Sequence, residues 1–176
     1  MYKLLVVLGM LFLNKEILIF DFTKETSVLA WQQTNDDVMG GVSTSRMTID
    51  ENGHGVFLGN VSTANNGGFA MTRLPVDIKI TEKHKKIVLY VKGDNKKYQF
   101  RLKSDVNQRH WYVHSFFAND TMQRIEIPLE DFYPSFRGNR LRINNFSSQN
   151  IKEIAILIGN KKNENFKLVI DKILVI

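Results

Sequence analysis

This 176-residue chain contains no cysteine among the side chains that could do chemistry. Disulfides, thiolate metal ligands and thiol nucleophiles are therefore excluded. Asn35, Asp36 and Asp37 place two carboxylates next to each other. Neighbouring side chains on an extended segment point to opposite sides, so these carboxylates are poorly placed to act as an acid–base pair.

The same three residues could bind calcium, which takes oxygen ligands from irregular loops. Their spacing does not follow a calcium-loop pattern, and Asx side chains commonly accept hydrogen bonds from nearby backbone amides. We therefore expect Asn35 or Asp36 to stabilise a turn, with calcium as the alternative. Otherwise the sequence predicts no metal and no cofactor.

Two of the four histidines, His110 and His114, lie four residues apart in a segment that is expected to be a strand. Zinc would need further ligands, and the neighbouring sequence offers few. The chain has no Gly-x-Ser-x-Gly elbow and no nucleotide-binding loop. We therefore expect no catalytic residues and no enzymatic activity.

A binding surface is the better candidate for function. Arg101 is expected on the polar face of one strand, and Tyr112 and His114 on one face of the next strand. If these strands are neighbours, the three side chains could hold a sugar or an extended peptide. The alternative is an ordinary solvated sheet face. Trp111, with Val113, is expected on the opposite face, in the core.

Strands must position these residues, because apolar residues alternate along much of the chain and no long window has a helical period. The alternation predicts strands around residues 87–91, 98–102, 125–127, 154–158 and 168–173. Glycine and asparagine turn signals separate these segments. The pattern predicts an all-β, single antiparallel β-sandwich of jelly-roll type over residues 17–176.

The segment from Trp31 to Ser43 is the most unusual connection in the chain. It contains three Asx residues and then Gly40 and Gly41, which can adopt positive φ without steric cost. We expect a rigid loop anchored in the core by Trp31, with positive φ at one of the two glycines. A second pair, Gly67 and Gly68, is expected to allow a tight bend or a close backbone approach.

Trp31 and residues 35–43 resemble the signature of the complex I (NADH:ubiquinone oxidoreductase) intermediate-associated protein 30 family. Four further blocks follow in the family's order, at residues 57–73, 89–102, 127–138 and 156–170. The resemblance implies a galactose-binding-domain-like β-sandwich without catalytic residues. It also implies a chaperone-like assembly factor, with unfolded protein binding, for complex I or another membrane complex.

The implied partners are protein subunits of a respiratory or other membrane complex. A carbohydrate-binding module-like protein with a glycan ligand is the alternative, by analogy of fold. Phe136 and Arg137 belong to an aromatic loop that could be an interface or a lid. The candidate partner- or ligand-binding residues are Asn35, Asp36, Asp37, Met39, Arg73, Arg101, Tyr112, His114, Phe136 and Arg137.

The formal net charge of +6 comes from dispersed basic residues, without a continuous basic stripe. We therefore expect no nucleic-acid binding, and peripheral membrane association stays open.

In residues 1–16, Lys3 precedes an apolar run that is too short to span a bilayer. This segment suits a signal or tether, although no small-residue cleavage site follows; an added strand or helix is the alternative. A cell-envelope or membrane-associated location is favoured over the cytoplasm.

Overall fold

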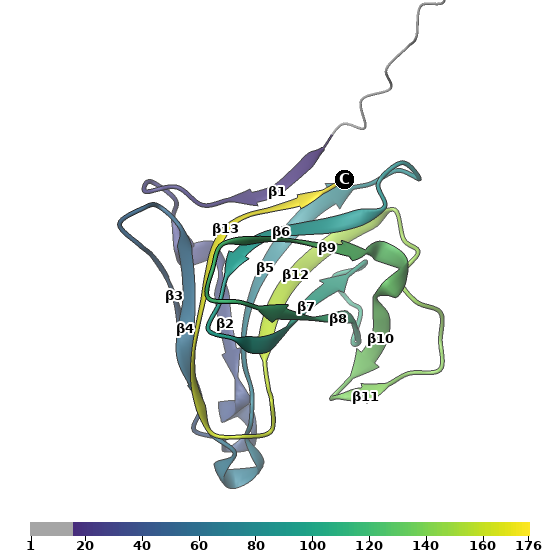
Figure 1. Cartoon of the computed structure of the whole chain (residues 1–176). Coiled ribbons are helices and arrows are strands. Elements are labelled where there is room, and N and C mark those ends of the chain that lie inside the picture. The colour runs from purple at the N-terminus through teal and green to yellow at the C-terminus, as the bar shows by residue number, and fades with distance from the viewer. Residues whose placement is uncertain (1–15) are drawn as a thin grey trace, which may run out of the picture.

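The computed structural model of this protein describes residues 16–176, apart from the side chains of residues 38 and 39. This described part consists of thirteen strands and short 3-10 turns, without an α-helix (Figure 1). It therefore has no helix of the length and apolarity that would cross a membrane. The apolar run before residue 16 lies outside the described residues.

One sheet of the sandwich has six antiparallel strands. The order is β3-β4-β13-β6-β9, and β1 also pairs with β13, which is long enough to contact three strands. The strands of this sheet are β1 (Ile17–Asp21), β3 (Thr44–Ile49), β4 (Gly55–Val61), β6 (Lys86–Lys92), β9 (Gln123–Pro128) and β13 (Glu164–Val175).

The second sheet has seven antiparallel strands in the order β11-β10-β8-β7-β12-β5-β2. Four 3-10 turns lie between strands: η1 (Val28–Ala30), η2 (Asp36–Met39), η3 (Ala64–Asn66) and η4 (Leu129–Asp131). The strands of this sheet are β2 (Gln32–Asn35), β5 (Ala70–Lys79), β7 (Lys96–Lys103), β8 (Trp111–Ala118), β10 (Tyr133–Phe136), β11 (Asn139–Arg140) and β12 (Asn150–Ile158).

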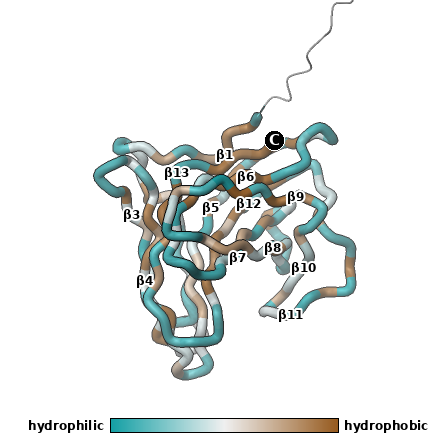
Figure 2. Tube along the Cα trace, in the orientation of Figure 1, coloured by the Kyte–Doolittle hydropathy of each residue, from teal (hydrophilic) through white to brown (hydrophobic). Residues whose placement is uncertain are grey.

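The core lies between the two sheets, and alternate residues of each strand fill it. Leu89 from β6, Phe100 from β7 and Ile156 from β12 are completely buried there. Figure 2 shows the apolar residues concentrated in the strands and the polar residues in the connections. The predicted all-β sandwich is therefore confirmed, and it follows from the period of two in the sequence.

Trp31 packs in this core directly after η1. Its side chain is only 2% exposed, and its ring lies 5.4 Å from the ring of Phe20 and 5.6 Å from that of Phe22. Both phenylalanines belong to the segment around β1. Trp31 thus joins the first strand of one sheet to β2 of the other, immediately before the Asx-rich loop.

Candidate functional site

The carboxylate of Asp36 is the centre of the Asx-rich loop. Its Oδ1 accepts a hydrogen bond from the amide of Ser43 at 3.0 Å, and its Oδ2 accepts one from the Ser43 hydroxyl at 2.5 Å. The same Oδ2 accepts the amides of Gly68 at 2.6 Å and Phe69 at 3.3 Å. Asp36 is 1% exposed, so one buried carboxylate joins two loops that are distant in sequence.

These donors determine the charge of the Asp36 site. Burial alone would raise the pKa of Asp36, but the hydrogen bonds from Ser43, Gly68 and Phe69 outweigh it and lower the pKa. The carboxylate is therefore ionised at neutral pH, and its negative charge is balanced by four donors. This surrounding of N–H and O–H groups favours turn stabilisation over the calcium alternative, because a cation requires oxygen ligands instead.

Two glycine pairs allow the chain to approach this carboxylate. Gly40 has φ +83°, and a Cβ on Gly41 would overlap Oδ1 of Asp36. A Cβ on Gly67 would lie 2.6 Å from Oδ2 of the same residue. One glycine of each pair, Gly41 and Gly67, thus leaves room for the buried carboxylate, whereas Gly40 and Gly68 have positive φ.

The other candidates in this loop have different surroundings. Asn35 accepts a hydrogen bond from the Ser45 hydroxyl at 2.7 Å, and Asp37 is exposed. Met39 lies in η2, and its side chain is outside the described part of the structure. A partner-binding role for these three residues stays a prediction.

The expected row of Arg101, Tyr112 and His114 does not form, because Arg101 lies on the other face of the sheet. β7 and β8 are neighbours, but their register pairs Arg101 with Val113. Tyr112 and His114 therefore point to the core side. There the Tyr112 ring lies 5.3 Å from Phe146, and His114 packs against a second phenylalanine. The prediction that these three side chains share a face is wrong.

His114 also lacks the surroundings of a catalytic base. Burial lowers its pKa, which the nearby Asp131 raises only in part, so the imidazole is neutral at pH 7. Its Nδ1 is buried without a hydrogen-bond partner among the described residues. No described carboxylate orients this ring towards a pocket.

Arg101 belongs instead to the outer face of the seven-stranded sheet, which is the side turned away from the core. Ala155 of β12 pairs with Arg101 of β7 on one side and with Arg73 of β5 on the other. We call these three residues the arginine row. Two residues further along β12, Leu157 pairs with Met71 of β5. We call these two residues the apolar row.

Positive charge exceeds negative charge on this face. Glu153 is the carboxylate beside the arginine row, with Oε1 3.4 Å from Arg73 and Oε2 2.9 Å from Lys103. Arg101 instead donates two hydrogen bonds to Oε1 of Gln99, from Nε at 3.1 Å and from Nη2 at 2.6 Å. Burial lowers the pKa of Arg101 to about 10, so the guanidinium remains charged at neutral pH without a carboxylate partner in the described chain.

Trp111 lies on this outer face, so the prediction that it lies in the core is wrong. It packs against the buried cluster that Met71, Ala155 and Leu157 form, and the Lys103 ammonium lies 4.5 Å from the centre of its ring. Tyr133 of β10, paired with Val113, has the Arg140 guanidinium 4.9 Å from its ring centre. Both aromatic rings are thus in contact with a cation.

Phe136 and Arg137 lie at the hairpin between β10 and β11. Arg137 and Gly138 both have positive φ, 49° and 80°, which is the geometry of a two-residue hairpin turn. The Phe136 ring lies 5.4 Å from the guanidinium of Arg109 and 5.5 Å from that of Arg137. These candidates therefore form an arginine-rich tip at the β11 edge of the seven-stranded sheet.

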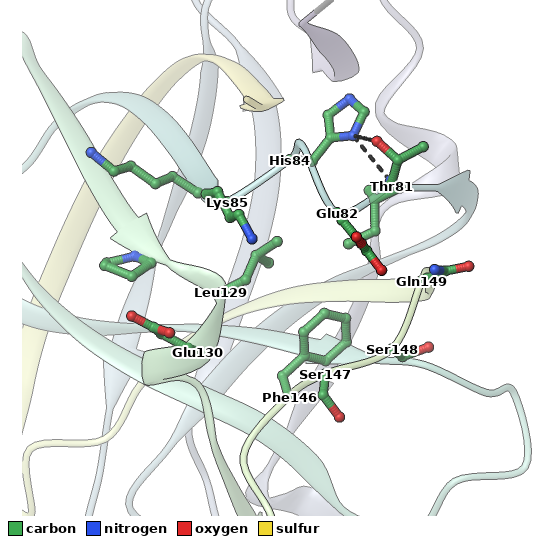
Figure 3. A pocket seen from close by; sticks show the side chains of 13 residues that line it. Thr81, Glu82, His84, Lys85, Leu129, Glu130, Phe146, Ser147, Ser148 and Gln149 are labelled. Carbon is green, nitrogen blue, oxygen red and sulfur yellow. Dashed lines mark hydrogen bonds between the residues drawn. The ribbon is translucent and has the colours of Figure 1, made fainter. Parts of the chain in front are cut away.

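A pocket of about 580 Å³ opens elsewhere, at the ends of β5, β6 and β9 (Figure 3). Its apolar lining comes from Ile80, Leu129 and Phe146, and its polar lining includes lysine, glutamate and serine side chains. His84 Nδ1 lies 3.0 Å from both the amide and the hydroxyl of Thr81. None of the candidate residues from the sequence lines this pocket.

Comparison with known proteins identifies the family. Residues 20–170 match the family model of Complex I intermediate-associated protein 30 (CIA30). The chain belongs to this family. No curated protein sequence matches this CIA30 member.

Solved structures with a similar fold include carbohydrate-binding modules. A family 11 module from Clostridium thermocellum, in complex with a beta-1,3-1,4-mixed-linked tetrasaccharide, is 20% identical with a TM-score of 0.67, covering 92% of this chain and 95% of that chain. A family 11 module of a cellulosomal cellulase of the same organism is 21% identical with a TM-score of 0.68, covering 92% and 94%. A family 29 module from Piromyces equi is 12% identical with a TM-score of 0.55, covering 92% and 89%. At these identities the likeness shows the fold, which is the predicted galactose-binding-like sandwich.

Proposed function

We propose that this CIA30 protein is a non-catalytic assembly factor that holds a protein segment of complex I, or of another membrane complex, on the outer face. Family membership supports the assembly role. The observation that carries the choice of site is the partly exposed Trp111 ring, which has the Lys103 ammonium 4.5 Å from its centre and lies on the same face as Arg101. Apolar contacts next to hydrogen-bond donors suit the side chains and carbonyl groups of a polypeptide.

Glycan binding is the second candidate, because the similar structures include carbohydrate-binding modules and one of them holds a tetrasaccharide. Trp111 and Tyr133 would be the aromatic platforms on the same face. However, a sugar stacking on the cation-bearing sides of these rings would displace Lys103 from Trp111 and Arg140 from Tyr133. This cost makes a peptide the preferred ligand.

The assembly role can be tested in cells that produce this protein and contain complex I. Deletion of the gene is expected to lower the amount of assembled complex on native gels and the NADH:ubiquinone oxidoreductase activity of membranes. Leu157→Lys should fail to restore both, because it places a charge in the apolar row. Leu29→Lys, at a side chain that is 90% exposed outside the outer face, controls for the added charge and should restore both. Because Leu157 is only 7% exposed, thermal melting must first show that Leu157→Lys folds.

Two results would refute the assembly proposal. One is normal complex I in the deletion strain, and the other is full restoration by a stably folded Leu157→Lys protein. Specific binding on a glycan array that Trp111→Ala abolishes would establish the second candidate in its place.

We further propose that residues 1–16 tether the folded domain to a membrane surface. The apolar run after Lys3 is the support for this proposal. Membrane fractionation of the full chain and of a chain without residues 2–15 tests it. Equal partition of the two chains would contradict the tether.

A further inference from the structure

We infer that the six-stranded sheet binds, with the side turned away from the core, a membrane surface that contains anionic phospholipids. We call this side the basic face, and it lies opposite the outer face of the seven-stranded sheet. It is therefore separate from the site of the proposed function, and its binding does not require the tether of residues 1–16. The basic residues of this face are Arg46, Lys86, Lys92, Arg124, Lys167 and Lys172.

Strand pairing brings these basic residues together from distant parts of the chain. Arg46 of β3 and Lys167 of β13 both pair with Leu58 of β4, so the three residues form one row across the sheet. In the next row, Lys92 of β6 pairs with Val169 of β13. The residues on either side of Lys167 belong to the core, so both rows point outward. Charges that are dispersed in the sequence thus share one face.

A third row continues the basic face to β9. Lys172 pairs with Tyr90, its ammonium lies 4.9 Å from the centre of that ring, and Tyr90 pairs in turn with Arg124. The Glu126 carboxylate contacts Arg124 and lies 2.7 Å from the Lys86 ammonium. This part of the face is therefore partly neutralised.

The charge of the remaining part is positive and accessible. Arg46, Lys92 and Lys167 are exposed, and they make no ion pair within the described part of the chain. Exposed cations without acidic partners attract an anionic surface within a Debye length of about 8 Å. The acidic residues on or beside the face are fewer than the basic ones: Asp21, Asp50, Glu126 and Asp171.

A hollow of about 260 Å³ lies between two of the unpaired cations, Lys92 and Lys167. Its apolar lining includes Val169 and Met122, and Met122 is 44% exposed. Asp50 also lines the hollow, but its carboxylate already accepts two backbone amides of its own turn, at 2.9 and 2.8 Å. Two ammonium groups beside apolar side chains suit the phosphate of a lipid headgroup and the start of its acyl chains.

Exposed apolar side chains among the cations favour a membrane over a nucleic acid. Leu18 of β1 is 52% exposed and pairs with Leu174, two positions from Lys172 on the same face. Nucleic-acid surfaces present aromatic rings for stacking, whereas the Tyr90 ring is half-buried beneath the Lys172 ammonium. A membrane on this side leaves the outer face of the seven-stranded sheet free for a protein partner.

Flotation of the full chain with two kinds of vesicle tests this inference. One kind is pure phosphatidylcholine, and the other is phosphatidylcholine mixed with the anionic phosphatidylglycerol. Each Lys or Arg close to an anionic membrane strengthens binding about fivefold. The double substitution Lys92→Gln and Lys167→Gln should therefore raise the lipid concentration for half-maximal binding to the anionic vesicles by about tenfold or more. Binding to pure phosphatidylcholine should stay unchanged.

Lys79→Gln combined with Lys97→Gln is the matched control, because both lysines are exposed on strands of the seven-stranded sheet and the net charge changes equally. This control should bind the anionic vesicles like wild type. An equal loss in the two double variants would overturn the inference, because it would indicate attraction by net charge. Equal binding of wild type to both kinds of vesicle would also overturn it. A DNA duplex that displaces the chain from anionic vesicles, at an equal concentration of phosphate groups, would replace the membrane by a nucleic acid.

A chain without residues 2–15 separates the basic face from the proposed tether, because the deletion removes Lys3, Lys15 and the apolar run. This chain should keep its preference for anionic vesicles and its sensitivity to the Lys92 and Lys167 substitutions. Loss of that preference would overturn the inference and assign the attraction to Lys3 and Lys15. Binding equal to that of the full chain would refute the tether and support the basic face.

Discussion

Replacement of Asp36 by asparagine tests the role that the structure gives to the Asx-rich loop. The asparagine oxygen would take the position of Oδ2, where three donors converge, and its NH2 group would then face the Ser43 amide. An unsatisfied buried donor costs about 1–3 kcal/mol, and the remaining bonds lose their charge assistance. We expect Asp36→Asn to lower the free energy of unfolding by about 3 kcal/mol. For a chain of this length, this loss lowers Tm by about 6–12 °C.

Thermal melting followed by circular dichroism measures this change, and Asp120→Asn, at an exposed turn position, is the control. The pKa of Asp36 is lower in the folded state, so its stabilisation is complete above the unfolded value of about 4 and is lost as pH falls through the folded value. The difference in stability between wild type and Asp36→Asn should therefore shrink in acid below about pH 4. A variant that melts within about 2 °C of wild type at pH 7 would refute the account of this carboxylate.

Three further substitutions extend the test, each measured by urea unfolding. Gly41→Ala should destabilise more than Gly40→Ala, because only its Cβ would overlap Asp36, whereas Gly40→Ala adds positive-φ strain of about 1–2 kcal/mol; equal losses would contradict this. Trp31→Ala should cost about 3–5 kcal/mol because Trp31 fills the core, and a loss below about 1 kcal/mol would show that it does not. Trp111→Ala should cost less than Trp31→Ala, because Trp111 lies on the outer face, and the reverse order would place it in the core.

The sequence predicted the strands because alternation is a local property. The apolar residues 87–91 and 98–102 fall within β6 and β7, and residues 154–158 fall within β12. The Asx-rich loop was also predictable in outline, since Asp36 accepts backbone amides and Gly40 has positive φ. The hydrogen bond from the Gly68 amide to Asp36 was not predictable, because it depends on how two loops that are distant in sequence meet.

The face of β8 could not be read from alternation alone. Trp111 and Tyr112 are both aromatic, and apolar residues continue on both sides of the strand, so either face could be the core. Only the register with β7, which pairs Phe100 with His114, decides between them. The prediction placed Trp111 inside and Tyr112 outside, and both assignments were reversed.

Sequence reasoning missed Glu153, Leu157 and Met71, although one signal for part of this set was available. Residues 154–158 form an unbroken apolar run, which is typical of a strand covered on both faces. That run predicts an apolar patch outside the core as well as residues within it. Which residues of β5 and β7 complete the patch depends on strand order, and strand order is a non-local property.

The strand order also bears on how this protein is made in the cell. β12 lies between β5 and β7 in one sheet, β13 joins β4 to β6 in the other, and these are the last two strands of the described chain. On the ribosome, the earlier strands therefore emerge with their inner edges unpaired: the seven-stranded sheet lacks its centre until translation has passed residue 158, and the six-stranded sheet until it has passed residue 175. An incomplete nascent chain exposes edges that could pair with other chains. Folding of this domain is thus expected to be completed only after residue 175 has been synthesised, and termination before that point should give aggregation rather than a smaller folded domain.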